Sequence, residues 1–281
     1  VQHESIMYIE IDRCGSAAEL KRLAESLREV LSHVRAAVSD FGAMREQAEA
    51  VIKGLKGKQF SYFPAAERKE CEAFLGWLLE DHFTFLGYER FNIHEGLKQQ
   101  RLGIQPEHSL GVLGLNTRDE SLEGLPEKVI DYLRRPVLLS FAKASSSSRV
   151  HRPAYPDYVS VREVDSEGRV IAEHRFMGLY TSRVYAGTVE RIPHLRQKVA
   201  AVREASGFTR HSHLGKELDQ ALQVLPRDDL FQMSEEELRD TALSIVQIQE
   251  RNQIRVFLRS GNYGRFYYCL VYVPREIYST E

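Results

Sequence analysis

The chain has few cysteines, only Cys14, Cys71 and Cys269 in 281 residues. An odd number of widely separated cysteines argues against a disulfide framework or a zinc knuckle, and favours free thiols in a reducing compartment. The sequence also lacks any apolar run near the roughly 18 residues that a membrane span needs. It has no signal-peptide pattern. We therefore expect a cytoplasmic protein that has no membrane partner.

An excess of charge of one sign is absent too. Lys and Arg number 38 against 40 Asp and Glu, which leaves a net charge of −2. A basic surface is what attracts nucleic acid or an anionic membrane, so neither is predicted as a partner. Hydrophobic residues make up 43% of the chain, which is enough to bury the cores of two or more domains.

The common motifs of catalytic and cofactor sites are missing. There is no G-x-G-x-x-G, P-loop, H-E-x-x-H or G-x-S-x-G. His211 and His213 form the only close histidine pair, and no third ligand is near them, so an exposed loop is favoured over a metal site. The glutamates at 235–237 suit a helix start rather than an acid–base pair. We predict no catalytic residue, bound cofactor or metal in this chain.

Both ends of the sequence indicate incomplete folding units. Residues 5–12 (SIMYIEID) predict a lone strand. Residues 253–281 predict two strands joined by a hairpin turn at 261–264 (GNYG). The next residues, 279–280 (ST), are typical of a helix N-cap, but the sequence ends at Glu281, before that helix could form. We expect a segment of a larger protein, with the function of a part: sensing, docking or assembly.

A long helix is predicted near the N-terminus. Ser16 and Glu19 have the spacing of a capping box, S-x-x-E. Apolar residues then recur every three or four positions from Leu20 to Leu55, which predicts one helix of roughly 50 Å. Small alanines at several of these positions favour a rod that connects two domains over a dimer seam. The remaining interpretation is a helix packed on its own domain.

The middle of the chain predicts an α+β domain over residues 60–205. Its expected helices begin at Ala65, Pro126 and Pro193, and the last of them ends before Gly207. Its expected strands cover residues 83–93, 109–115, 136–143, 158–164, 169–179 and 181–186. Two further helices are expected, one over residues 214–225 and one capped by Ser234 with Glu237 as its box partner.

Two sets of residues are candidates for binding. Four arginines of the C-terminal hairpin could hold the carboxylate of a small effector or of a neighbouring subunit, although a solvated strand face explains them as well. They are Arg255, Arg259, Arg265 and Arg275. A cluster of aromatic residues could line a pocket in the middle domain, although simple core packing is favoured. These are Phe85, Tyr88, Tyr158, Phe176 and Tyr180.

Several blocks, in the same order, resemble the N-terminal region of the large bacterial NAD-dependent glutamate dehydrogenases. They are DHFTFLGY at 81–88, HRPAY at 151–155, FMGLYTS at 176–182, PRDDLFQ at 226–232 and VPREIYST at 273–280. None of these blocks is mechanistic by itself, and the ordered set is what makes the resemblance specific.

The resemblance implies an α+β architecture in which a PAS-like antiparallel-sheet domain is joined by a long helix to parts of flanking ACT-like (ferredoxin-like) domains. Residues 1–13 would be the closing strand of one ACT-like domain, and 14–56 the connecting helix. Residues 57–205 would be the PAS-like domain, and 206–281 the first part of a second ACT-like domain.

The resemblance also implies a parent enzyme that converts L-glutamate, NAD and water to 2-oxoglutarate, ammonia and NADH. Its catalytic core would lie downstream, so NAD would belong to the parent enzyme and this chain alone would be inactive. We expect a regulatory and oligomerisation segment, with an amino-acid effector and with the rest of its own chain and sister subunits as partners. The alternatives are a stand-alone PAS- or ACT-type small-molecule sensor and a structural spacer.

Overall fold

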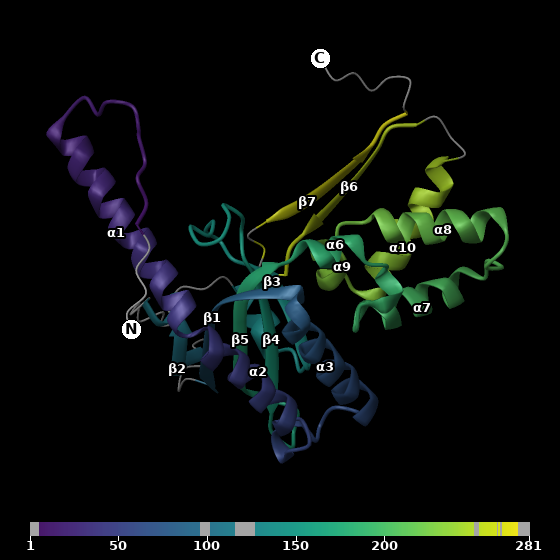
Figure 1. The fold of residues 1–281 in the computed structure, drawn as a ribbon. Helices are drawn as coiled ribbons and strands as arrows, with labels where there is room; N and C mark the ends of the chain where they lie inside the picture. The colour runs from purple at the N-terminus through teal and green to yellow at the C-terminus, as the bar shows by residue number, and fades with distance from the viewer. Residues whose placement is uncertain are drawn as a thin grey trace.

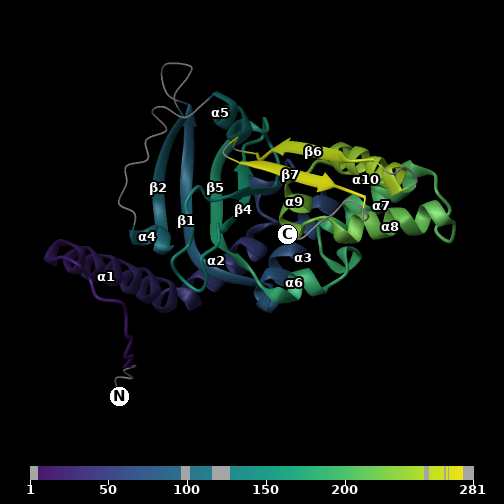
Figure 2. The ribbon, with the colours of Figure 1, turned by 90° about the horizontal axis from the view of Figure 1, so that it is seen from above.

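A five-stranded antiparallel sheet forms the centre of the protein, as seen in a computed structural model that describes residues 6–95, 102–115, 127–249, 253–262, 264 and 266–274. The strand order is β2-β1-β5-β4-β3, and Figure 2 labels β2, β1, β5 and β4 in this order. The bounds are Phe83–Glu95 for β1, Leu102–Gly111 for β2, Leu139–Lys143 for β3, Asp157–Val164 for β4 and Val170–Tyr180 for β5. The sheet confirms the α+β class that the sequence predicted.

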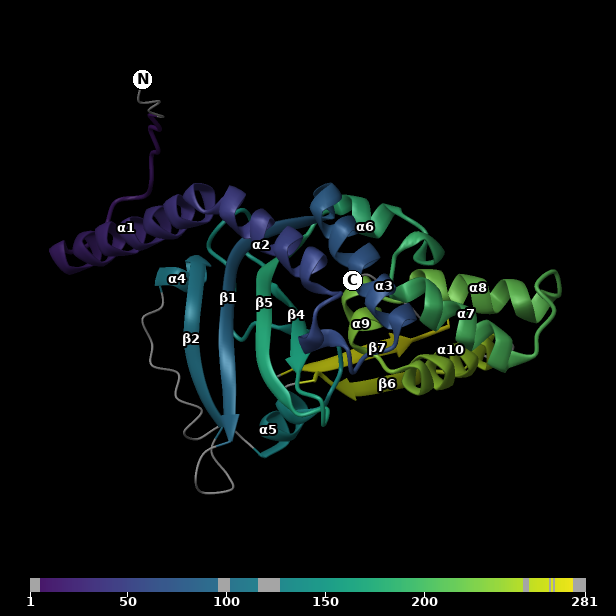
Figure 3. The same ribbon diagram turned by 90° about the horizontal axis from the view of Figure 1, so that it is seen from below.

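Helices lie over one face of the sheet and continue beyond it. Helix α2 (Phe41–Gly54) and helix α3 (Ala65–Trp77) lie over one face, while α1 (Ala17–Ser39) extends away from it (Figures 1 and 3). The remaining helices are α4 (Val112–Leu115), α5 (Glu127–Arg134), α6 (Ser182–Ala186), α7 (Leu195–Ser206), α8 (His213–Val224), α9 (Arg227–Gln232) and α10 (Glu235–Gln249). A separate hairpin, β6 (Arg255–Ser260) and β7 (Tyr267–Tyr272), follows them.

The expected single rod over residues 16–55 is two helices. The capping box at Ser16 and Glu19 is present, but α1 ends at Ser39 and α2 begins at Phe41. Between them, the carboxylate of Asp40 accepts a hydrogen bond of 2.7 Å from the backbone N–H of Gly111. This contact comes from a residue 71 positions away, so no local pattern could reveal it.

Two expected strands differ in the structure. Residues 182–186 form helix α6, and Thr181 precedes it as an N-cap in extended conformation. Residues 109–115 contribute the end of β2 and then the short helix α4, after a turn at Gly111 with a φ of 62°. Of the expected strand at 5–12, residue 5 lies outside the described residues, and residues 6–12 form no strand and are exposed.

Other local predictions are confirmed. The β4–β5 hairpin turns at Gly168, which has a φ of 81°. Helix α7 ends at Gly207 in the left-handed conformation. The backbone N–H of Glu237 donates to the hydroxyl of Ser234, and the N–H of Ser234 donates to the Glu237 carboxylate, which completes the second capping box.

One hydrophobic core joins the sheet to the helices that follow it. Phe74 of α3, Phe141 of β3 and Phe231 of α9 make mutual ring contacts, with centroids 5.2 to 5.5 Å apart. The ring of Tyr180 stacks on Phe231 at 5.0 Å. In the part of the chain that the structure describes, no helix is long and apolar enough to cross a membrane.

A buried ion pair crosses the sheet. Arg162 of β4 and Glu173 of β5 face each other in register, 3.0 Å apart, with no side-chain exposure. The Nη1 of Arg162 also donates to the backbone oxygens of Tyr132 and Arg135, both at 2.9 Å. The sheet therefore contains a buried arginine, and the carboxylate of the neighbouring strand compensates its charge.

Replacement of Glu173 with Ala is expected to lower the free energy of unfolding by about 3–5 kcal/mol, because it leaves the guanidinium of Arg162 buried without its carboxylate. Urea unfolding followed by circular dichroism measures this loss. The matched control is Glu25→Ala, which breaks an exposed pair with Lys21 and is expected to cost less than about 1 kcal/mol. Equal costs for the two variants would show that the buried pair is not stabilising.

Candidate functional site at the junction of the sheet, helices and hairpin

The short helix α9 occupies the junction between the sheet, α7 and the terminal hairpin. The ammonium of Lys198, on α7, donates to the backbone oxygens of Leu230, Phe231 and Met233 at 3.2, 3.0 and 2.7 Å. These are the carbonyl groups that the end of a helix leaves unsatisfied. Burial lowers the pKa of Lys198 to about 8. Lys198 thus fixes the C-terminal end of α9 in place.

On the side of α9 nearer the sheet, two carboxylates share one lysine. The Nζ of Lys143 lies 2.8 Å from Asp157 and 2.7 Å from Asp228. The hydroxyl of Tyr185, on α6, donates to the other oxygen of Asp228 at 2.8 Å. Burial raises the pKa of Asp157 to about 7; Lys143 lowers it and the negative charge of Asp228 raises it further. We call Lys143, Asp157 and Asp228 the shared-lysine cluster.

The hydroxyl of Tyr180 lies beside this cluster. It is buried and has no hydrogen-bond partner among the described residues. Burial first, and then the charges of Asp157 and Asp228, raise its pKa well above the ordinary value. An unsatisfied buried hydroxyl next to two carboxylates makes this a costly polar region. The cluster therefore places Asp157, whose pKa is about 7, between the sheet and helix α9.

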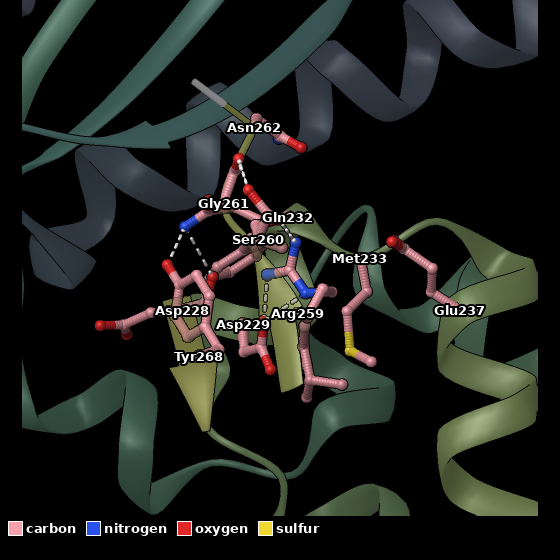
Figure 4. A network of polar contacts seen from close by, with 12 residues as sticks. Asp228, Asp229, Gln232, Met233, Glu237, Arg259, Ser260, Gly261, Asn262 and Tyr268 are labelled. Carbon is pink, nitrogen blue, oxygen red and sulfur yellow. Dashed lines mark hydrogen bonds and ion pairs between the residues drawn. The ribbon is translucent and has the colours of Figure 1, made fainter. Parts of the chain in front are cut away.

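On the side of α9 nearer the hairpin, a second aspartate is paired. The Nε of Arg259, on β6, donates to Asp229 at 2.9 Å, and its guanidinium lies 4.6 Å from the ring centre of Tyr268 on β7. The side-chain amide of Gln232 donates to the hydroxyl of Tyr268. Figure 4 shows these contacts between α9 and the turn end of the hairpin.

A groove of about 390 Å³ runs between α10 and the hairpin. We call it the hairpin groove; it is lined in part by Asp229, Met233, Glu237, Phe257 and Arg259. Three carboxylates, including Asp240, line it against one guanidinium, and that guanidinium is already paired with Asp229.

The predicted arginines are not all brought together. Arg259 belongs to the junction and is largely buried, whereas Arg255 stands exposed at the start of β6, opposite Tyr272. Arg265 and Arg275 lie outside the described residues. Their role in binding an effector stays a prediction.

The predicted aromatic cluster divides between the two faces of the sheet. Phe85, Tyr88 and Phe176 make ring contacts at 5.0 to 5.9 Å, and Tyr180 joins the same core. Tyr158 packs with a smaller core group, and the guanidinium of Arg175 lies 5.2 Å from the centre of its ring. A ligand pocket lined by these residues also stays a prediction.

Sequence reasoning missed Lys143, Asp157 and the whole of helix α9. The block PRDDLFQ was a signal only for the position of α9, to which it contributes Asp228 and Asp229. Among the described residues, no group of three or more His, Cys, Asp or Glu could hold a metal ion. All strand pairs described are antiparallel, so these residues offer no parallel β-α-β unit of the kind that cradles NAD.

Comparison with known proteins first defines a class. The helical segment at residues 192–251 matches the model of glutamate dehydrogenase helical motif 1, and residues 255–281 match that of the glutamate dehydrogenase ACT2 domain. The chain is thus an α+β segment that contains a helical motif and part of an ACT domain of the glutamate dehydrogenase type.

The particular family follows from alignments along the chain. The chain is 54%, 45% and 31% identical to the NAD-specific glutamate dehydrogenases of Pseudomonas aeruginosa, Halomonas elongata and Mycobacterium tuberculosis. The alignments cover 100%, 99% and 94% of this chain but only 17%, 17% and 15% of those relatives. The chain therefore corresponds to a segment of the NAD-specific glutamate dehydrogenases, as the sequence resemblance predicted.

The shared-lysine cluster generates a pH prediction. Between 3.8, the ordinary pKa of Asp157, and about 7, its pKa here, the folded protein holds a proton that the unfolded chain has released. This contribution to the free energy of unfolding is therefore complete below pH 3.8 and is lost as the pH rises to about 7. In Asp157→Asn, urea unfolding measured across this range is expected to show a weaker decline than in the native sequence.

Asp228→Asn is the matched control for this measurement. It removes the negative charge of Asp228, and Lys143 then pairs with Asp157 only. The pKa of Asp157 therefore falls, and the loss of stability moves to lower pH. Parallel curves for the native protein and Asp157→Asn would contradict the raised pKa.

Proposed function

We propose that the chain is a non-catalytic regulatory and assembly segment of an NAD-dependent glutamate dehydrogenase. The parent enzyme would convert L-glutamate, NAD and water to 2-oxoglutarate, ammonia and NADH. The observation that carries the proposal is the alignment of the whole chain with a small part of NAD-specific glutamate dehydrogenases. The match to an ACT2 domain supports the regulatory role, because the family resemblance associates ACT-like units with subunit pairing and amino-acid binding.

The central domain fits the PAS-like part of this proposal. Its five-stranded antiparallel sheet has helices over one face, and its strands β4 and β5 are joined by a tight turn. Neither feature supplies a nucleophile or an acid–base pair. In this role the domain would bind a ligand, transmit a signal or position other parts of the protein. The chemistry would occur elsewhere in the parent enzyme.

The outer face of the hairpin supports the assembly role. Val256 and Leu258 of β6, with Tyr267 and Val271 of β7, stand 55% to 71% exposed. The opposite face of the same hairpin, with Phe257 and Leu270, packs against the core. A two-stranded sheet with one apolar face open to solvent is incomplete. We infer that a sister subunit or another part of the parent polypeptide covers this face.

Leu258→Lys in a full-length enzyme that contains this segment tests the assembly role. A lysine on the covered face would have to be buried without a partner, so the molar mass measured by light scattering is expected to fall or the protein to lose its native assembly. Val224→Lys, at an exposed apolar position on α8, is the control and is expected to change nothing. An unchanged assembly in Leu258→Lys would contradict the proposal.

The isolated chain is expected to produce no NADH from L-glutamate and NAD, followed by absorbance. Turnover by the chain alone would overturn the non-catalytic role. A nucleotide-like or cofactor-like ligand that raises the melting temperature of the sheet domain alone would instead support the stand-alone sensor. Strong self-association with no response to any ligand would support the spacer.

A further inference from the structure

A second hollow, of about 440 Å³, adjoins the hairpin groove and shares Met233 and Glu237 with it. Its walls come from the α5–β3 connection, β3, the start of α7, the α9–α10 turn and the hairpin tip. We call it the His194 pocket; it is lined by Arg135, Phe141, His194, Phe231, Glu237 and Asn262, among others. Its volume lies within the range of about 300–1,000 Å³ that is typical of small-molecule sites.

The walls of the His194 pocket are held in place by contacts within the protein. The rings of Phe141 and Phe231 stack at 5.2 Å, and the imidazole of His194 lies 5.0 Å from Phe141. The side-chain amide of Asn262 donates to the backbone oxygen of Phe141 at 2.8 Å and to the hydroxyl of Tyr132 at 3.1 Å. A ligand would therefore not have to order these walls, which lowers the free-energy cost of binding.

His194 is held in an unusual conformation at the edge of this pocket. Its φ is 69°, a value that non-glycine residues rarely adopt. Its backbone N–H donates to Glu70 at 2.7 Å, and Glu70 is in turn paired with Arg196. The ring nitrogens have no hydrogen-bond partner among the residues described. Burial, and then the charge of Lys198, lower the pKa of His194 to about 3, so the imidazole is neutral and offers one donor and one acceptor.

The charges around the His194 pocket favour an anion. Two cationic residues, Arg135 and Lys198, line it together with the single carboxylate of Glu237. The ammonium of Lys198 is used by three backbone oxygens, so it contributes charge rather than a contact. Arg135 lies 5.9 Å from the ring centre of Tyr132, and no carboxylate pairs with it among the described residues. Its planar guanidinium is the group that binds carboxylates through two hydrogen bonds.

We propose that the His194 pocket binds a small organic carboxylate, with the carboxylate on Arg135 and a second polar group of the ligand on the imidazole of His194 or the amide oxygen of Asn262. The aromatic rings of Phe141 and Phe231 would contact the carbon atoms between these two groups. Binding to the pocket stands independently of the proposed function. Only an effect of the ligand on a dehydrogenase would rest on that function.

Calorimetric titration of the intact chain with succinate, 2-oxoglutarate and L-glutamate tests the proposal, with succinamide as an uncharged probe of similar size. At least one of the three carboxylates is expected to bind, and succinamide to bind at least about tenfold more weakly, since it cannot form the charged pair with Arg135. No binding of any carboxylate at millimolar concentrations would overturn the proposal, as would equal binding of succinamide.

Two variants locate the site. Arg135→Gln is expected to weaken the binding of the carboxylate about tenfold or more. Arg191→Gln removes an exposed charge outside the pocket and is expected to leave binding unchanged. Val137→Trp fills the pocket without a change of charge and is expected to abolish binding, with circular dichroism as the check on folding. Binding that survives Arg135→Gln or a folded Val137→Trp would place the ligand elsewhere and overturn the proposal.

Discussion

Two adjacent aspartates on α9 hold the junction together from opposite directions. Asp228 reaches Lys143 at the edge of the sheet, and Asp229 reaches Arg259 on the hairpin. Neighbouring residues on a helix do not face the same way, so a single turn of chain can contact two separate elements. The contacts of Lys198 with the last carbonyl groups of α9 keep this turn from fraying. This turn, together with the hydrogen bond from Asn262 to Phe141, holds the hairpin against the sheet.

Apolar packing and ionic contacts have different roles at the junction. The rings of Phe74, Phe141, Phe231 and Tyr180 form one continuous cluster, and their burial supplies most of the stabilisation. Buried ion pairs add little net stability, because desolvation offsets most of their attraction. They are, however, specific in geometry, since a displaced partner leaves a buried charge uncompensated. The rings therefore stabilise the contact between the sheet and α9, and the aspartates define its orientation.

Local signals in the sequence predicted the elements that local interactions stabilise. The box at Ser16, the left-handed cap at Gly207 and the turn at Gly168 each need only neighbouring residues, and each was predictable. The break at Asp40 coincides with a contact to Gly111, far along the chain, and the apolar period of the sequence continues across it. Helix α9 has only six residues and carries no helical period of its own, so no local signal predicted it.

The candidate site was predictable in part, for the same reason. Arg259 was identifiable as one of four hairpin arginines that could bind a carboxylate, but its partner Asp229 comes from α9. Lys143 and Asp157 become neighbours only through the register of β3 and β4. Apolar residues in place of the shared-lysine cluster would make the junction at least as stable. The junction instead retains one lysine between two carboxylates, and burial raises the pKa of one of them, Asp157, to about 7. The cluster can therefore change its charge near neutral pH.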